Sequence, residues 1–83
     1  MKPVTIYTTP YCPFCVRAKR LLTQKKVAYE EIDVSVDDDA RERLAARTGQ
    51  QTVPQIYIGE KHVGGSDELY ELESKGELDA LLQ

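Results

Sequence analysis

Cys12 and Cys15 are the residues of this 83-residue chain whose type and spacing best suit covalent chemistry. A thiolate is a nucleophile toward disulfides and a ligand for metals, and a Cys-X-X-Cys spacing is typical of redox centres or metal sites. In a reducing compartment such a pair is more often redox-active or metal-binding than part of a permanent bridge. The segment Cys12-Pro13-Phe14-Cys15 is therefore the candidate active site.

Pro13 predicts that this segment opens a helix. Proline is favoured at the first helical position because its missing N–H would have no partner there, which places Cys12 at the N-cap. The sulfur then faces free N–H groups and the positive end of the helix dipole, which favour the thiolate over the thiol. Cys12 is the predicted nucleophile. Cys15 lies one turn further along and is the predicted resolving thiol.

Two other interpretations of the cysteine pair are weaker. A zinc site needs four ligands, and beyond the cysteines the chain offers only His62 and carboxylates. A structural disulfide would close a loop too short to stabilise the fold much. A Cys-X-X-Cys segment that follows a strand and opens a helix is typical of thioredoxin-like redox chemistry, which is the interpretation we favour.

The elements that position the cysteines follow from the hydrophobic pattern. Apolar alternation and turn residues predict strands and helices in the order β-α-β-α-β-β-α. The predicted strands are 4–8, 27–36, 55–58 and 61–63, and the predicted helices are 13–25, a segment from the acidic triplet 37–39 to Gly49, and a stretch from Ser66, with a C-terminal turn at 78–82. The triplet is interpreted as a helix start rather than a cation site, which would need further spaced oxygen donors. The order predicts an α/β fold with a mixed four-stranded sheet flanked by helices.

Size and charge narrow the function further. A chain of 83 residues predicts one domain, 1–83. Fourteen acidic residues against 11 basic ones give a net charge of -3, and Lys and Arg form no block that would bind nucleic acid. The N-terminus alternates polar and apolar residues, unlike a signal peptide, and no stretch reaches membrane-spanning length. We expect a cytoplasmic monomer with no nucleic-acid or membrane partner.

Three motifs resemble the glutaredoxin family, in particular its short bacterial dithiol members. They are Tyr-Cys-Pro-Phe-Cys at 11–15, Thr-Val-Pro-Gln at 52–55 and Gly-Gly-Ser-Asp-Glu-Leu at 64–69, in the family's order and spacing. The resemblance spans essentially the whole chain. It implies a thioredoxin-like fold and a glutathione-disulfide oxidoreductase that reduces protein disulfides and protein–glutathione mixed disulfides. Glutathione would be the reducing co-substrate, with no tightly bound cofactor and no metal.

The resemblance also implies where glutathione binds. The family's Thr-Val-Pro proline is cis and faces the active cysteine, and the residue before it pairs main-chain groups with glutathione; Pro54 and Val53 match, with Thr52 in the same motif. The stretch after the hairpin resembles the site for the γ-glutamyl end. There Gly65 and Ser66 begin a helix whose N–H groups suit a carboxylate, and Asp67 can accept from the ammonium.

The remaining implied contacts lie near the first two motifs. Gln51 is the candidate for the glycine carboxylate, and Tyr11 and Phe14 are expected to line the groove. Thr9 departs from many relatives, which carry Lys there, so one charge contact is missing. His62 is assigned a solvated or cross-strand position in the hairpin and no catalytic role.

Three related classes of protein are alternatives to a glutathione-dependent enzyme, and each differs from this sequence in one or two features. Thioredoxin carries its proline in the second intervening position, and this chain has no Trp. Reductase-fed glutaredoxin-like donors carry a different stretch after the hairpin. Iron–sulfur carriers, which ligate a cluster through the first cysteine, usually lack a proline at the position of Pro13.

Overall fold

The computed structural model describes residues 2–10, 12–49 and 53–83. Within these residues the strands form a four-stranded sheet in the order β2-β1-β3-β4, with β1 parallel to β2 and antiparallel to β3, and β3 antiparallel to β4. The elements in chain order are β1 (Val4–Thr8), α1 (Pro13–Gln24), β2 (Tyr29–Asp33), α2 (Asp38–Thr48), β3 (Gln55–Ile58), β4 (Lys61–Gly64), α3 (Ser66–Ser74) and α4 (Leu78–Leu82). The predicted mixed sheet flanked by helices is confirmed.

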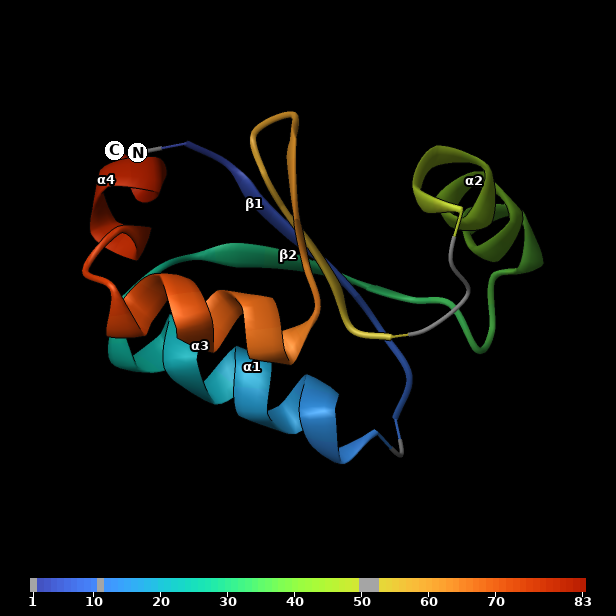
Figure 1. Ribbon diagram of the computed structural model, residues 1–83. Helices are drawn as coiled ribbons and strands as arrows, with labels where there is room; N and C mark the ends of the chain where they lie inside the picture. The colour runs from blue at the N-terminus through green and yellow to red at the C-terminus, as the bar shows by residue number, and fades with distance from the viewer. Residues whose placement is uncertain (1, 11, 50–52) are drawn as a thin grey trace.

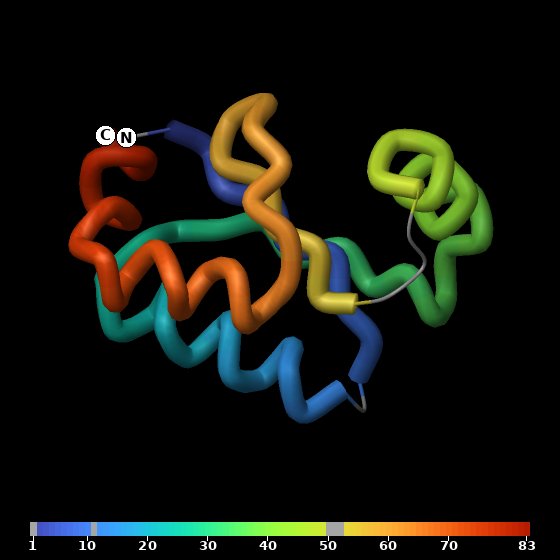
Figure 2. The backbone as a smooth tube through the Cα atoms, viewed as in Figure 1, coloured from blue at the N-terminus to red at the C-terminus, as the bar shows by residue number. Residues whose placement is uncertain are grey.

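Helices cover the two faces of the sheet unequally. In Figures 1 and 2, α1, α3 and α4 lie on one side of the strands and α2 on the other. Side chains alternate between the faces, so Val4 and Ile6 of β1 join the core under α1, α3 and α4, whereas Tyr7 packs toward α2. The larger core cluster comprises Val4, Ile6, Ala18, Leu21, Leu22, Val27, Ile56, Ile58, Leu69, Leu78 and Leu82. The smaller one comprises Val34, Ala40, Leu44 and Tyr57.

Two expectations about element bounds were wrong. The second strand, predicted over 27–36, is only Tyr29–Asp33. At the start of the predicted segment, Val27 belongs to the turn after α1, where its N–H donates to the Leu22 carbonyl. At the other end, β2 stops at Asp33, whose carboxylate accepts from the Ser35 N–H at 2.8 Å. The C-terminal segment, predicted as a turn, forms the short helix α4.

Capping explains why α2 begins and ends where it does. The Asp37 carboxylate accepts from the Ala40 N–H at 3.0 Å, as expected for a helix N-cap. Gly49 ends the helix with φ 70°, a left-handed conformation that suits glycine. The acidic triplet is therefore a helix start, as predicted.

Sheet topology brings two loops to one end of the molecule. Because β1 and β3 are antiparallel, with Tyr7 opposite Gln55, the carboxyl end of β1 and the amino end of β3 lie together. The first end leads to Cys12 and the second follows Pro54. At the opposite end, Lys2 N–H donates to the Leu82 carbonyl at 2.8 Å, so the chain's beginning and end lie side by side. In the part of the chain that the structure describes, no helix is long and apolar enough to span a bilayer.

Replacing Leu22 with alanine should lower the free energy of unfolding by about 2–5 kcal/mol, because Leu22 is fully buried in the larger core cluster. Val16→Ala on the same helix is the matched control: Val16 is 47% exposed, so the change should stay within about 0.5 kcal/mol. Urea unfolding followed by circular dichroism measures both. Equal losses in the two variants would contradict the assigned core.

Candidate active site

Cys12 caps helix α1 with its sulfur. Its backbone is extended, with φ -101° and ψ 111°, and its Sγ accepts from the Cys15 N–H at 3.3 Å. Pro13 occupies the first helical position. The predicted N-cap placement is confirmed. The free N–H groups and dipole of the helix thus act on this sulfur, which is the arrangement that favours a thiolate.

The turn before β3 closes over the same sulfur. The Cys12 thiol donates to the Val53 carbonyl, with Sγ and the oxygen 3.6 Å apart. The Val53-Pro54 peptide bond is cis, as predicted. A molecule attached to Cys12 would therefore lie beside the main chain of Val53, where an extended peptide can pair with backbone groups.

Cys15 sits in a different environment from Cys12. It is only 1% exposed, whereas Cys12 is partly exposed. Burial, followed by a hydrogen bond to Cys12, raises the pKa of the Cys15 thiol to about 12, although the Thr9 backbone amide and the Lys19 charge act in the opposite direction. Cys12 is thus open to an incoming disulfide, and Cys15 is a protonated thiol behind it.

A groove beside the contact between Cys12 and Val53 reaches the start of α3. It is open and has a volume of about 200 Å³, below the range of about 300–1,000 Å³ typical of pockets that enclose a drug-sized ligand. Its lining residues are Phe14, Val53, Pro54, Gln55, Gly65, Ser66, Asp67 and Glu68. Glycine at 65 avoids a tight contact, because a Cβ there would lie 3.3 Å from the Pro54 carbonyl oxygen.

Ser66 presents an unusual polar group in this groove. The residue is only 3% exposed, and within the described ranges its Oγ is a buried polar atom without a hydrogen-bond partner. Ser66 is also the first residue of α3, whose N–H groups there have no partner within the helix. The preceding Gly65 N–H donates to the Glu68 carboxylate at 3.3 Å. The end of the groove therefore offers donors suited to an anionic group.

The structure brings together most of the predicted site. Around the groove lie Cys12 and six of the predicted contacts, which are Phe14, Val53, Pro54, Gly65, Ser66 and Asp67. Tyr11, Gln51 and Thr52 lie outside the described residues. His62 lies away from the cysteines, with Nε2 2.6 Å from Gln55 Oε1 and its ring stacked on Tyr57, a cross-strand position as predicted.

Comparison with known proteins identifies the family. The chain matches the Glutaredoxin family over residues 4–63. It belongs to this family. The Glutaredoxin of Pseudomonas aeruginosa is 55% identical over 82 residues, 99% of this chain and 98% of that protein, and Glutaredoxin 3 of Escherichia coli is 46% identical over the full length of both. The buckwheat glutaredoxin–glutathione complex has a similar structure, with a TM-score of 0.90 and 34% identity over 98% of this chain and 76% of that one.

Membership settles the general chemistry and the fold. This glutaredoxin is a thiol–disulfide oxidoreductase with a thioredoxin-like fold. Sequence reasoning missed Gln55 and Glu68 as lining residues. Their adjacency to Pro54 and Asp67 was the available signal, but which side chains turn into the groove depends on the backbone path.

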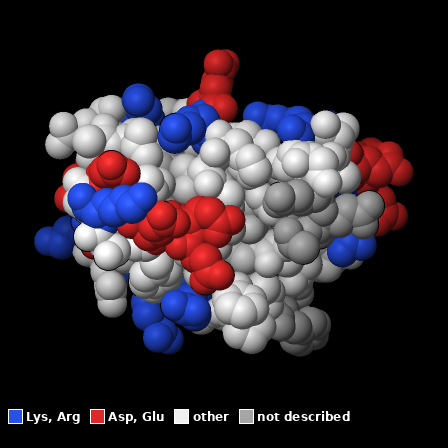
Figure 3. Space-filling model, in the orientation of Figure 1, with Lys and Arg blue, Asp and Glu red and all other residues white. Residues whose placement is uncertain are grey.

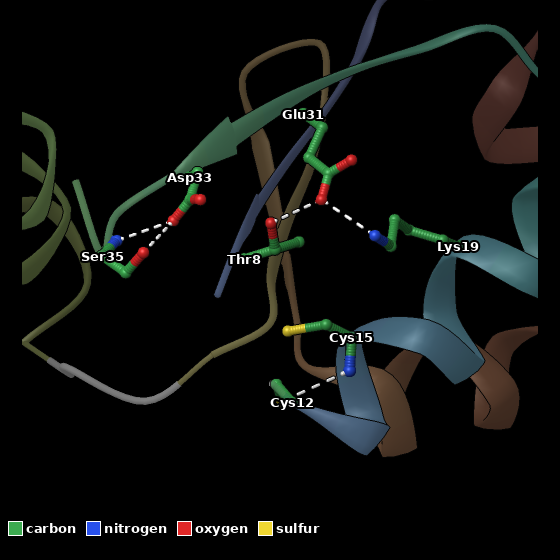
Figure 4. A network of polar contacts seen from close by, with 7 residues as sticks. All are labelled: Thr8, Cys12, Cys15, Lys19, Glu31, Asp33 and Ser35. Atoms are coloured by element: carbon green, nitrogen blue, oxygen red, sulfur yellow. Dashed lines mark hydrogen bonds and ion pairs between the residues drawn. The ribbon is translucent and has the colours of Figure 1, made fainter. Parts of the chain in front are cut away.

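A polar network behind the cysteines was also missed (Figure 4). The Glu31 carboxylate of β2 accepts from the Thr8 hydroxyl at 2.7 Å and from Lys19 Nζ at 2.9 Å. The hydrogen bond from Thr8 has the largest effect in lowering the pKa of Glu31, and the bond from Lys19 lowers it further. The same bond to Glu31 raises the pKa of Lys19. Both groups are therefore charged at neutral pH. The spacing of four residues between Cys15 and Lys19 was the available signal in the sequence.

Charge is unevenly distributed over the visible face of this glutaredoxin. Figure 3 shows acidic side chains gathered over α3, with basic side chains next to them and elsewhere on this face. The acidic residues of α3 are Asp67, Glu68, Glu71 and Glu73. The α3 wall of the groove is therefore acidic at Asp67 and Glu68, beside N–H groups that favour an anion.

Cys15→Ala should flatten the loss of stability at alkaline pH. The folded protein holds the Cys15 proton up to a pKa of about 12, whereas an unfolded cysteine loses it near about 8.5. Below the unfolded pKa this group leaves stability unchanged with pH; above it, the unfolded state binds fewer protons and the free energy of unfolding falls. Urea unfolding at several pH values should show a steeper alkaline decline in the wild type. Parallel declines would contradict the raised pKa.

Proposed function

We propose that this glutaredoxin is a glutathione-disulfide oxidoreductase that reduces protein disulfides and protein–glutathione mixed disulfides. Cys12 is the nucleophile, Cys15 the resolving thiol, and glutathione the reducing co-substrate, with no tightly bound cofactor and no metal. One observation carries the proposal: the capping sulfur of Cys12 contacts Val53, which lines a groove whose far end holds a buried Ser66 hydroxyl without a partner among the described residues.

The groove offers a partner for each end of a γ-glutamyl-cysteinyl peptide. With the ligand's sulfur on Cys12, its cysteine main chain lies beside Val53, and its γ-glutamyl end extends toward α3. The carboxylate meets the N–H groups and hydroxyl at Ser66, and the ammonium meets Asp67. The buckwheat glutaredoxin, solved as a glutathione complex on a similar fold, supports this placement.

The residues outside the described ranges complete the proposed site at its other end. Gln51 is proposed to meet the glycine carboxylate, with Tyr11 and Thr52 beside it, on the strength of the motifs alone. Phe14 lines the groove and is 52% exposed, so it is available to a ligand as an apolar wall.

Two reactions use the cysteines differently. Toward a protein–glutathione mixed disulfide, the Cys12 thiolate attacks the glutathione sulfur and the protein leaves as a thiolate. A second glutathione thiolate then attacks the glutathione sulfur on Cys12, which restores Cys12 and releases glutathione disulfide. Toward a protein disulfide, Cys12 becomes joined to the target, and Cys15 displaces it.

We further propose that the chain acts as a monomeric single domain over residues 1–83 in the cytoplasm, where it serves electron transport in cell redox homeostasis. Its partners would be glutathione and disulfide-containing or glutathionylated proteins. The net charge of -3, with no block of Lys and Arg, supports the absence of a nucleic-acid partner.

Cys12→Ser should abolish both reactions, whereas Cys15→Ser should separate them. Deglutathionylation needs only Cys12, so Cys15→Ser should keep a rate within roughly tenfold of the wild type, yet lose most reduction of an intramolecular protein disulfide. A coupled assay with glutathione, its NADPH-dependent reductase and a glutathionylated peptide measures the first reaction. Insulin reduction measures the second. If Cys15→Ser is as inactive as Cys12→Ser in the coupled assay, the glutathione-specific proposal fails.

Ser66→Ala should separate binding from stability. Removing a buried hydroxyl that has no partner among the described residues should leave the free energy of unfolding unchanged or raise it. Losing its hydrogen bond to glutathione should raise KM for the glutathionylated peptide by about two- to tenfold. Ser74→Ala, at the far end of α3, is the matched control and should change neither quantity. An unchanged KM in Ser66→Ala would remove this hydroxyl from the binding site.

A further inference from the structure

The resolving step poses a problem that the cysteine pair does not solve alone. Cys15 must become a thiolate before it can attack, because the thiol is not a nucleophile. Yet Cys15 is 1% exposed, and burial and the hydrogen bond to Cys12 both hold its proton in place. A group that favours the thiolate must lie near this buried sulfur if the step is to proceed at neutral pH.

Lys19 is the cation in position to do this. It lies four residues beyond Cys15 on α1, and residues at this spacing lie on one face of a helix. In Figure 4 the Cys15 side chain points from α1 toward Thr8 at the end of β1, and the Lys19 ammonium extends over the same region toward Glu31. The positive charge of Lys19 also lowers the pKa of Cys15, against the effect of burial.

The ammonium is held in place from the sheet. Lys19 Nζ lies 2.9 Å from Glu31 Oε2, and the same oxygen accepts from the Thr8 hydroxyl at 2.7 Å. Thr8 is 1% exposed and is anchored by its carbonyl, which accepts from the Val34 N–H. A lysine tethered in this way has fewer orientations than a free one, so its charge is held at the Glu31 carboxylate, from where it acts on Cys15.

We propose that Lys19, tethered by Glu31 and Thr8, is a positioning residue whose fixed positive charge favours the Cys15 thiolate in the resolving step. The proposal rests on the resolving role proposed for Cys15. In that step the Cys15 proton passes to solvent, and the thiolate attacks the Cys12 sulfur of the mixed disulfide. The bond between Cys12 and the target breaks as the Cys12–Cys15 bond forms, and the target leaves as a thiolate that takes up a proton.

The other charges around Cys15 set the direction of the effect. In the free protein, Cys12 at the N-cap of α1 opposes the Cys15 thiolate, and the Thr9 amide favours it. In the mixed disulfide Cys12 carries no charge, so burial is the effect that Lys19 acts against. On β2, Glu31 faces Lys19 directly, while Tyr29 acts on Lys19 and Asp33 on Glu31. Replacing Lys19 by a neutral residue therefore removes a charge that stabilises the thiolate and leaves the opposing groups in place.

A glutathione-independent disulfide separates this proposal from the proposed function. In stopped flow with 5,5′-dithiobis(2-nitrobenzoate), attack by Cys12 releases one coloured thiolate, and closure by Cys15 releases a second. Closure is intramolecular, so its rate does not depend on reagent concentration. The chains to compare are the wild type, Lys19→Met, Lys19→Arg and Lys25→Met, across the acidic to mildly alkaline range. Lys25, at the other end of α1, pairs with Glu73 and Asp79 and controls for a lost ion pair.

Lys19→Met should slow closure by about threefold at each pH and leave the first release unchanged. This size follows from a smaller thiolate population, partly offset by the higher nucleophilicity of a more basic thiolate. Lys19→Arg should restore the rate, and Lys25→Met should match the wild type. Closure in Lys19→Met equal to that in Lys25→Met, or an equal slowing of the first release, would overturn the proposal. Loss of deglutathionylation in Cys15→Ser would instead overturn the glutathione-specific function. The closure rates would still test the role of Lys19, because they are measured without glutathione.

Discussion

The Cys12 sulfur takes the place of the side-chain oxygen that usually caps a helix, and the rest of the site depends on this contact. Because Cys15 N–H donates to it at 3.3 Å, the reactive atom is fixed relative to α1. Pro13 makes the arrangement possible, since the first helical position needs no N–H. The sheet then determines what the sulfur meets, because antiparallel β1 and β3 bring the Val53 carbonyl to 3.6 Å from it.

From that contact the two thiols acquire opposite properties although they are one turn apart. Cys12 lies at the helix end, partly exposed, where N–H groups and the dipole act on it. Cys15 lies inside the helix against the sheet, where burial raises its pKa to about 12. The protein thus presents the Cys12 thiol to substrates and keeps the Cys15 thiol buried and protonated. Lys19 matters because Cys15 must still lose its proton before it can resolve a mixed disulfide.

Local patterns in the sequence predicted the fold well, and long-range contacts account for what they missed. β1 was predicted over its observed residues because alternation and a following proline mark both ends. The second strand was predicted too long because Val27 and Val34 are apolar for burial, not for strand pairing. The residues expected to bind glutathione followed from family motifs, and the described ones line or adjoin the groove. The tether of Lys19 to Glu31 joins α1 to β2, and no pattern within either segment reveals which residues face each other.

Among the described residues, one buried side-chain oxygen lacks a hydrogen-bond partner, and it lies in the groove of the proposed site. In the part of the chain that the structure describes, the Ser66 hydroxyl has no hydrogen-bond partner, whereas the buried Cys15 thiol has one in Cys12 and keeps its proton because its pKa is raised to about 12. Stability alone would favour alanine at position 66, since a buried polar group without a partner is costly. A ligand carboxylate at the end of the groove would supply a partner for the Ser66 hydroxyl. The free energy lost by burying this hydroxyl without a hydrogen bond would then be regained when the ligand binds.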